Sequence, residues 1–215
     1  QMEAAGRVSL SVGALPSVAA RLMPEVVQAF SELAPDVMLH IHDGPHGYLI
    51  EELRRGQLDM VIGRMGAPEV MRGIAFTQLY DEHVEFVVRR GHPLLAQPDI
   101  HRLEDWPVIF PPAAAAIRPL VERALVAQGV GEIGRKVESV SGAFGRNHAL
   151  SHDAVWIISH GVVAKELESG ALVRLPFDTS LTKGPVGLMA RTEGQLSAAE
   201  SLFRRVLTEV AGRIG

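Results

Sequence analysis

Paired histidines are the residues of this chain whose types and spacing most directly suggest chemistry. His40 and His42 are two residues apart, and His148 and His152 are four apart. Residues i and i+2 share one face of a strand, and residues i and i+4 share one face of a helix, so each pair has the spacing of two metal ligands. The sequence contains no His-Glu-x-x-His motif, and no third ligand suggests itself beside either pair. We therefore expect no bound metal.

Two further patterns resemble those of enzyme sites, but their context is wrong. Residues 129–134 match the glycine pattern of a dinucleotide-binding turn, which needs a strand before it and a helix after it. Here a predicted helix precedes the glycines and a predicted strand follows them. Ser159 and His160 are merely adjacent, and no Gly-x-Ser-x-Gly elbow occurs. The absence of cysteine excludes thiolate catalysis and disulfide bonds. We expect no catalytic residue and no cofactor.

Turns that precede predicted helices are candidate sites for a small anion. The first N–H groups of a helix lack partners within the helix and carry partial positive charge, so they attract carboxylates. In a two-lobed α/β domain such turns lie at the carboxyl ends of the strands. They occur here at residues 16–18, 44–47 and 141–144. The second turn supplies three candidate ligand-binding residues, Gly44, Pro45 and His46, although His46 could also be an exposed loop residue.

Single side chains near these turns could also contact a ligand. Arg118 and Arg146 could clamp a carboxylate through two hydrogen bonds each, or could be solvated surface arginines. Phe144 could pack under an apolar or aromatic ring of a ligand, or could belong to the core. Ser17 is a plausible N-cap of the helix that follows it.

Charge and hydropathy argue against two classes of partner. The 215 residues carry a formal net charge of −4, and no Lys/Arg cluster is longer than a pair, so the chain lacks a basic patch for a phosphate backbone. The first residues lack the features of a signal peptide, and no apolar run approaches the length of a membrane span. We expect a cytoplasmic protein, or one trimmed of its leader, that binds neither DNA nor membranes by itself.

Hydrophobic periodicity predicts an α/β fold in which strands and helices alternate. The first part of the chain shows strands and helices in the order 7–12, 17–34, 37–42, 48–55 and 60–63. A strand–helix–strand–helix–strand order at this spacing predicts a parallel βαβαβ unit with right-handed crossovers.

The first helical segment contains a proline. Because proline is tolerated only in the first turn of a helix, Pro24 should follow a short turn and open the main helix. The buried face of that helix is predicted to carry Val26, Val27, Phe30 and Leu33.

The alternation restarts after Gly91-His92-Pro93, where a strand should stop. Further strands are predicted at 74–80, 84–88, 108–110, 135–139, 155–158, 172–175 and 187–191, and helices at 119–128, 144–151, 162–169 and 197–214. If residues 185–191 run antiparallel to residues 85–88, the last helix returns to the first lobe. We therefore predict two Rossmann-like lobes joined by two crossing strands, with residues 1–88 and 189–215 in lobe I and residues 89–188 in lobe II.

Several short segments, in this order, resemble the effector-binding domain of LysR-type transcriptional regulators. They are Leu15-Pro16-Ser17, Gly56-Gln57-Leu58-Asp59, Gly91-His92-Pro93-Leu94 and Leu103-Glu104-Asp105-Trp106. Residues 153–159 and 184–188 look most like the subgroup of the galactose-binding-protein regulator and the regulator of protocatechuate catabolism. The resemblance covers essentially the whole chain and implies the type 2 periplasmic-binding-protein fold. In the family this domain follows an N-terminal winged helix-turn-helix and a linker helix, which are absent here.

The resemblance implies a sensor rather than an enzyme. A small carboxylate effector, such as an intermediate of aromatic catabolism, would bind in the cleft between the lobes, and lobe closure would alter the arrangement of subunits. Ser17, Ser139 and Ser141 match positions where the family contacts its effector. The family also implies a homodimer or homotetramer, built with the first long helix and the last helix, and contact with DNA only through the missing N-terminal domain.

Two departures from the family pattern concern effector recognition. Residues 113–116 are all alanine, where family members often carry a hydroxyl ahead of the arginine that matches Arg118. Residues 152–155 replace the Gly-x-Gly turn that many members carry. Two other functions fit the same two-lobed scaffold: a solute-binding protein that serves a transporter, and an enzyme.

Overall fold

A computed structural model describes residues 7–214, which divide into two compact units. Unit 1 comprises the described residues up to Tyr80 and from Val186 onward, and unit 2 comprises Asp81–Pro185. The chain thus passes between the units twice, as predicted, but at Tyr80–Asp81 and Pro185–Val186 rather than after residues 88 and 188. The first difference arises because residues 84–88 pair with strands of unit 2.

Unit 1 is built on a five-stranded sheet in the order β2-β1-β3-β10-β4. Strand β1 pairs in parallel with β2 and with β3, which confirms the predicted βαβαβ unit, and β10 is antiparallel to β3. The strands are β1 (Ser9–Ala14), β2 (Met38–His42), β3 (Met60–Arg64), β4 (Ile74–Glu82) and β10 (Gly184–Arg191). The helices are α1 (Pro16–Ala20), α2 (Leu22–Leu33), α3 (His46–Arg54) and α7 (Ala198–Ile214).

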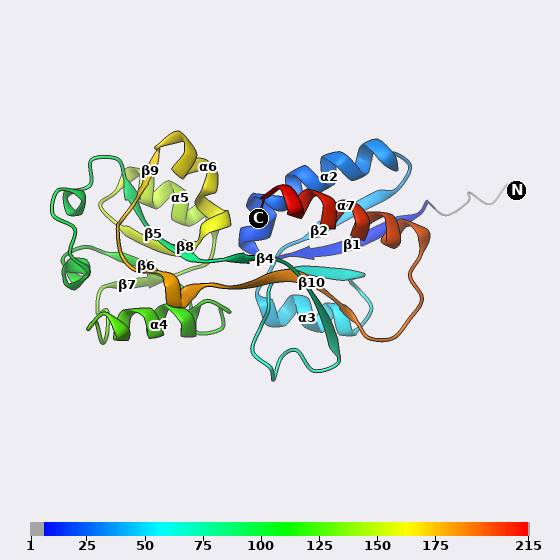
Figure 1. Cartoon of the computed structure of the whole chain (residues 1–215), viewed down its shortest axis with the longest axis horizontal. Helices are drawn as coiled ribbons and strands as arrows, with labels where there is room; N and C mark the ends of the chain where they lie inside the picture. Colours follow the sequence, from blue (N-terminus) through cyan, green and yellow to red (C-terminus); the bar gives the residue numbers. More distant parts are fainter. Residues whose placement is uncertain (1–6, 215) are drawn as a thin grey trace, which may run out of the picture. The chain divides into compact units, whose positions relative to one another are not determined.

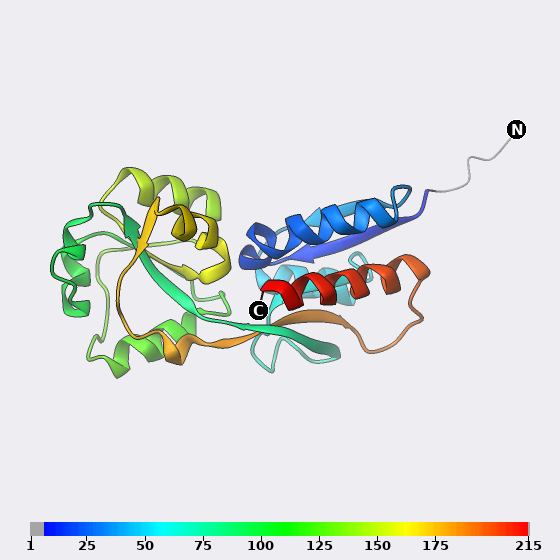
Figure 2. The ribbon, with the colours of Figure 1, turned by 45° about the horizontal axis from the view of Figure 1, so that its top comes forward.

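Helices cover both faces of this sheet (Figure 1). Successive strand residues point to opposite faces, so Met60 and Ile62 pack with α2 and α7, whereas Val61 packs with α3. Helices α2 and α7 lie side by side (Figure 2), and the rings of Phe30 and Phe203 meet edge to face with centroids 5.2 Å apart. The last helix therefore returns to unit 1, as the sequence predicts.

Helix α2 confirms the predicted place of Pro24 and corrects one predicted core residue. Pro24 is the third residue of the helix, where its missing N–H costs no helical hydrogen bond. Val26 and Phe30 are fully buried, and Val27 packs partly buried against the same core. Leu33 is 64% exposed, so its predicted burial is wrong. It is the last residue of the helix, where the chain turns away from the sheet toward β2.

The partner of β10 also differs from the prediction. Strand β10 lies between β3 and β4, not beside residues 85–88. Residues 84–88 are buried in the middle of the other sheet, with neighbours on both sides, so they offer no free edge. Close packing of β10 on β4 is visible at Gly187, where an added Cβ would overlap the carbonyl oxygen of Thr77.

Unit 2 is built on a second five-stranded sheet in the order β7-β6-β8-β5-β9. Strand β6 is parallel to β7 and β8, whereas β5 is antiparallel to β8 and β9. The strands are β5 (Val84–Arg89), β6 (Val108–Phe110), β7 (Lys136–Glu138), β8 (Val155–Ser159) and β9 (Leu172–Arg174). The helices are α4 (Arg118–Ala127), α5 (Gly142–Ser151) and α6 (His160–Ser169), with 3-10 turns η1 (Pro93–Leu95), η2 (Ile100–Asp105) and η3 (Ser180–Thr182).

The core of unit 2 is apolar and centred on β8 and β5, where Trp156 and Phe86 are fully buried. Across residues 7–214 no helix combines the length and apolar character that crossing a bilayer requires.

Candidate functional site

The carboxyl ends of β1 and β2 bring two predicted ligand-binding residues to one edge of the unit 1 sheet. The two strands are parallel, with Gly13 opposite His42 at their ends, so the turns that follow them leave the same edge. Ser17 lies in the helix after β1, and His46 begins the helix after β2. Residues 29 positions apart in the chain are thereby placed at one edge.

Ser17 does not cap its helix, so its predicted role as N-cap is wrong. The N-cap is Leu15, in an extended conformation, because Pro16 occupies the first helical position and fixes the helix start there. The side chain of Ser17 is buried, with the residue only 4% exposed. Within the part of the chain that the structure describes, no donor or acceptor pairs with its hydroxyl. The group is therefore available for a ligand.

His46 is a buried residue at the start of α3, not an exposed loop residue. Its Nε2 lies 3.3 Å from the carbonyl oxygen of Arg64, which can only accept a hydrogen bond, so Nε2 carries the proton. Burial lowers the pKa of His46 and outweighs the opposing effect of this hydrogen bond. Gly66 packs on the ring, and Pro45 forms the N-cap in an extended conformation. His46 is thus a neutral, fixed imidazole.

The residues around His46 form a tight turn. Gly44 lies against the ring of Tyr48, where an added Cβ would stand 3.0 Å from the ring carbon Cδ1. The N-cap Pro45 supplies no side-chain cap. The first N–H groups of α3 are therefore not occupied by a capping side chain, which suits an anion.

In unit 2, Ser139 and Ser141 follow β7, whose end lies beside the end of its parallel neighbour β6. The backbone N–H of Ser139 donates to the carbonyl oxygen of Phe110 (3.0 Å), which fixes this edge. Ser139 Oγ accepts from the N–H of Ser141 (3.1 Å), and Ser141 Oγ accepts from the N–H of Phe144 (3.2 Å). Ser141 is thus the N-cap of α5, and both hydroxyl groups keep a proton to donate.

Phe144 lies on the surface of α5, since it is exposed and stacks on the ring of His148 with centroids 5.4 Å apart. It is not part of the core. His148 in turn contacts His152, whose ring centroid lies 4.7 Å away. The two rings are in contact, but the predicted alignment along one helix face is only partly right, because α5 ends at Ser151 and His152 is its extended C-cap.

Neither predicted arginine is a solvated surface residue. Arg118 Nε donates to Glu122 (2.5 Å), and Nη1 donates to Glu138 and to the carbonyl oxygen of Pro111 (2.9 Å each). The hydrogen bond to Glu122 is the main reason why the pKa of Arg118 is raised. A carboxylate ligand at Arg118 would compete with these partners.

Arg146 ties α5 to α6. Its guanidinium pairs with Glu166 and donates to the carbonyl oxygens of Gly142 (3.2 Å) and Val162 (2.9 Å). A carboxylate ligand at Arg146 would compete with Glu166 for the guanidinium. The structure therefore assigns both predicted arginines a packing role within unit 2.

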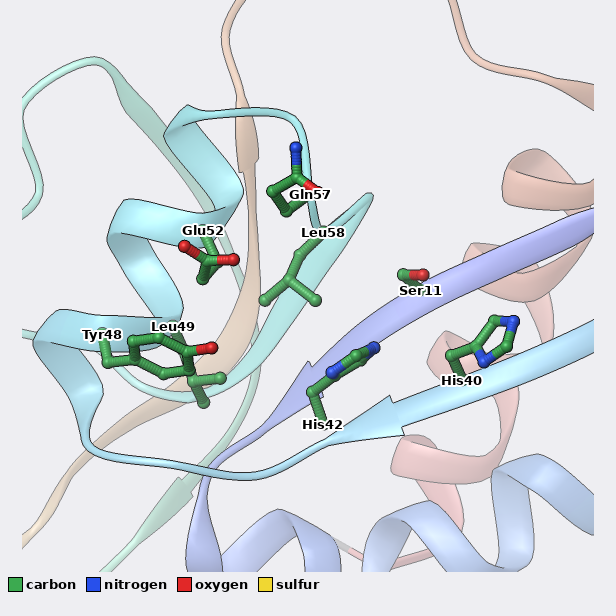
Figure 3. Close-up of a pocket in the computed structure, with 8 residues that line it drawn as sticks. All are labelled: Ser11, His40, His42, Tyr48, Leu49, Glu52, Gln57 and Leu58. Carbon is green, nitrogen blue, oxygen red and sulfur yellow. The ribbon is translucent and has the colours of Figure 1, made fainter.

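A pocket of about 300 Å³ lies in unit 1 between β2 and α3 (Figure 3). His40 and His42 extend from β2 on one side, and Tyr48 and Glu52 extend from α3 on the other. The two histidines share a strand face, as predicted, with ring centroids 6.4 Å apart. The remaining lining residues are Ser11, Leu49, Gln57 and Leu58.

One cluster escaped the sequence analysis altogether. His83, Glu85 and His160 place one potential ligand atom each within 4.8 Å of the others, and Arg174 pairs with the same carboxylate. Burial alone would raise the pKa of Glu85, but hydrogen bonds from His160 and Arg174 lower it to about 2. Only the short spacing of His83 and Glu85 is visible in the sequence, because His160, at the start of α6, and Arg174, in β9, are distant in the chain.

Comparisons with known proteins agree with the sequence resemblance. A model of the family described as LysR substrate binding domain matches residues 4–212. The HTH-type transcriptional regulator PcaQ of Agrobacterium fabrum is 43% identical over 206 residues, which cover 94% of this chain and 66% of PcaQ. The chain therefore spans just under two thirds of the length of this relative.

Solved structures share the fold at low sequence identity. The CcmR regulatory domain of Synechocystis PCC6803, in complex with 2-PG, matches with a TM-score of 0.79 and 17% identity, over 94% of this chain and 97% of that one. The effector binding domain of QuiR, in complex with shikimate, matches with a TM-score of 0.76 and 19% identity, over 97% and 99%. The predicted two-lobed α/β fold is thereby confirmed.

Proposed function

The chain belongs to the family of LysR substrate-binding domains, and from this premise we propose that it senses a small carboxylate effector for a transcriptional regulator. Its relative PcaQ is a transcriptional regulator and not an enzyme, and neither catalysis nor solute transport is favoured. We propose that the segment that contacts DNA lies in the part of the regulator that this chain does not cover. We place the whole regulator in the cytoplasm, with its DNA.

The observation that carries the proposal is the pairing of Ser17 and His46 at one edge of the unit 1 sheet. The hydroxyl of Ser17 has no partner among the described residues, so it is open to a hydrogen bond with a ligand. The uncapped N–H groups at the start of α3 favour a negative charge. His46 stays in the proposed site as the residue that fixes this turn, because its Nε2 proton is used by the carbonyl oxygen of Arg64. Together these groups suit a small anion better than a cation.

Unit 2 supplies a second set of groups for the same class of ligand. The hydroxyl protons of Ser139 and Ser141 remain free to donate, and Phe144 offers an exposed ring next to them. We propose these three residues as effector contacts, together with Gly44 and Pro45. Arg118 and Arg146 stay in the proposed site as residues that would exchange a glutamate partner for the effector.

The identity to PcaQ supports the aromatic-catabolism branch of the proposal, to which the sequence resemblance also points. The neighbouring structures in complex with shikimate and with 2-PG support a small polar effector in general. We propose a carboxylated intermediate of aromatic catabolism as the effector.

A thermal-shift screen tests the effector class. A compound that binds only the folded state raises the melting temperature, because it adds a stabilisation that grows with the logarithm of its concentration over its dissociation constant. We expect carboxylated aromatic catabolites to raise it, and matched sugars and amino acids to leave it unchanged. A shift with a sugar or an amino acid, and none with any carboxylated aromatic compound, would contradict the proposal.

The serine contact is tested with the compound found in that screen. Ser17→Ala should weaken its binding by about tenfold, the equivalent of one lost hydrogen bond. Ser201→Ala, on the exposed face of α7, is the matched control and should bind as the wild type does. Equal affinity of the two variants would remove Ser17 from the site.

A homodimer is part of the same proposal, with a homotetramer as the larger alternative. The apolar faces of α2 and α7 pack on each other inside unit 1, so they are not the surfaces left for a partner. Exposed apolar side chains remain at Leu33, Met38 and Ile41, at the end of α2 and on the edge strand β2. Light scattering of Ile41→Lys against the wild type tests whether this edge holds the dimer, because a charge there should shift the mass toward the monomer.

A further inference from the structure

Four polar side chains of unit 2 meet on or just beyond the ends of three adjacent strands, β8, β5 and β9. In the register of β5 with β8, Val84 lies opposite Ser159, so His83 and His160 lie opposite each other just beyond the strand ends. The N–H of His160 donates to the carbonyl oxygen of His83 (3.0 Å). Side chains alternate along a strand, so Glu85 shares the face of His83.

The fourth side chain comes from the other neighbour of β5. In the register of β5 with β9, Val87 lies opposite Arg174, which places Arg174 diagonally from Glu85 on the same face. Arg174 donates from Nε to Glu85 Oε2 (2.6 Å) and from Nη2 to Oε1 (2.5 Å). This double hydrogen bond fixes the orientation of the carboxylate.

Both imidazoles converge on one oxygen of that carboxylate. His83 Nε2 lies 3.0 Å and His160 Nδ1 lies 2.8 Å from Glu85 Oε1. The two rings stack, with centroids 5.3 Å apart and an angle of 25° between their planes. Two nitrogen ligands and one oxygen ligand therefore already face one another at the rim of the sheet.

We propose that His83, Glu85 and His160 form a binding site for a divalent transition-metal ion such as Zn²⁺. Two imidazoles and one carboxylate are a donor set that zinc accepts, with a water molecule in the fourth position. Two ligand atoms that each lie about 2.1 Å from a tetrahedral ion are roughly 3.4 Å apart. The distances from Glu85 Oε1 to His83 Nε2 and to His160 Nδ1 would therefore need to increase by only about 0.5 Å.

The exposure of the three side chains fits this role. The side chain of Glu85 is only 1% exposed and supplies a carboxylate ligand of fixed position, whereas the side chains of His83 and His160 are 42% and 23% exposed. The ion can therefore approach from solvent, and the histidines can adjust at little cost. The remaining ligand position would face water.

Arg174 shapes the affinity of this site. It keeps the buried carboxylate ionised, which a metal ligand requires, and it can retain Oε2 while Oε1 turns to the ion. Its positive charge also opposes a divalent cation nearby, so we infer a site of moderate affinity for a labile ion rather than a structural zinc site.

Cobalt binding tests the assignment on the chain as described. The wild type is titrated with Co²⁺ and followed by its visible absorption, and Zn²⁺ is then added to displace it. His83→Ala and His160→Ala should each weaken metal binding by on the order of tenfold or more. His83→Ala is the more informative variant because its exposed side chain can be removed without disturbing the core.

Two other histidine pairs provide matched controls, because they have chelating spacing but lack a converging carboxylate among the described residues. They are the pair His40 and His42 and the pair His148 and His152. Their alanine variants should bind Co²⁺ as the wild type does. The proposal would be overturned if the wild type took up no Co²⁺. It would also be overturned if a control variant lost Co²⁺ binding while His83→Ala kept it.

Discussion

Arg174 holds both carboxylate oxygens of Glu85, through Nε to Oε2 at 2.6 Å and through Nη2 to Oε1 at 2.5 Å. The two residues lie 89 positions apart in the chain and belong to neighbouring strands β5 and β9. A buried carboxylate is costly unless it is paired, so this contact decides whether Glu85 can stay ionised inside unit 2.

Acid should remove part of the stability that Glu85 provides. Its pKa is about 2 in the folded chain against an ordinary value of 4.5, so the unfolded state binds a proton that the folded state resists. The stabilisation, about 3 kcal/mol, is complete above the ordinary pKa and is lost as the pH falls toward 2. Urea unfolding near pH 7 and near pH 3 should show a loss of about 2 kcal/mol that Glu85→Gln lacks. An equal loss in the variant would contradict this.

Arg174→Gln should destabilise unit 2 because it leaves the carboxylate without its main partner. Breaking a fully buried pair costs roughly 3–5 kcal/mol, and since the side chain of Arg174 is half exposed we expect about 2 kcal/mol. The control is Arg213→Gln, whose pair with Glu209 is exposed on both sides and should contribute less than about 0.5 kcal/mol. Chemical denaturation of the two variants measures the difference.

His46 should make the chain less stable at mildly acidic pH. Burial lowers the pKa of His46 below its ordinary value of 6.5, so protons bind the unfolded state more readily. The free energy of unfolding should therefore fall as the pH drops below 6.5 and continue to fall until the folded pKa is passed. His46→Gln, which stays neutral, should flatten this slope in thermal unfolding. His101→Gln on exposed η2 should keep it.

The core between α2 and α7 should depend strongly on Phe30. Its ring is fully buried against Phe203, so Phe30→Ala should cost about 3–5 kcal/mol through lost burial and the cavity left behind. Leu33→Ala on the same helix removes an exposed side chain and should change stability by less than about 0.5 kcal/mol. Similar losses in the two variants would mean that the helix packs differently.

Two glycines should respond to alanine with opposite signs. A Cβ at Gly187 would overlap the Thr77 carbonyl oxygen of the adjacent strand, so Gly187→Ala should destabilise the sheet by about 1–3 kcal/mol. Gly212 lies in α7 with no atom within 4 Å of an added Cβ, so Gly212→Ala should stabilise by up to about 1 kcal/mol. Melting temperatures of the two variants give the signs directly.

Hydrophobic periodicity along the sequence was sufficient to predict the helices and strands that depend on neighbouring residues. The parallel βαβαβ order and the place of Pro24 were predictable because they depend on residues close in the chain. The partner of β10 was not predictable, because β4 and β5 are both predicted strands and only the complete sheets show that β5 has no free edge. Leu33 was misjudged for a related reason, since helical spacing cannot reveal where the sheet ends.

In the candidate site, too, features set by nearby residues were predictable and features set by distant residues were not. His46 was predictable as the start of a helix after a strand, but its burial depends on Arg64 and Gly66, which lie 18 and 20 positions further on. Ser17 was assigned a capping role that Pro16 prevents. The cluster at Glu85 was out of reach, because His160 and Arg174 lie 75 and 89 positions away and meet it only through strand register.

The two passages of the chain between the units have a consequence for biosynthesis. Unit 2 is one continuous segment, Asp81–Pro185, so strands β5 to β9 are synthesised before β10 and α7. Unit 1 needs α7 to cover Phe30 and the strand residues beneath it. During translation unit 2 can therefore fold first, while the apolar face of strands β1 to β3 stays partly uncovered until α7 has been made.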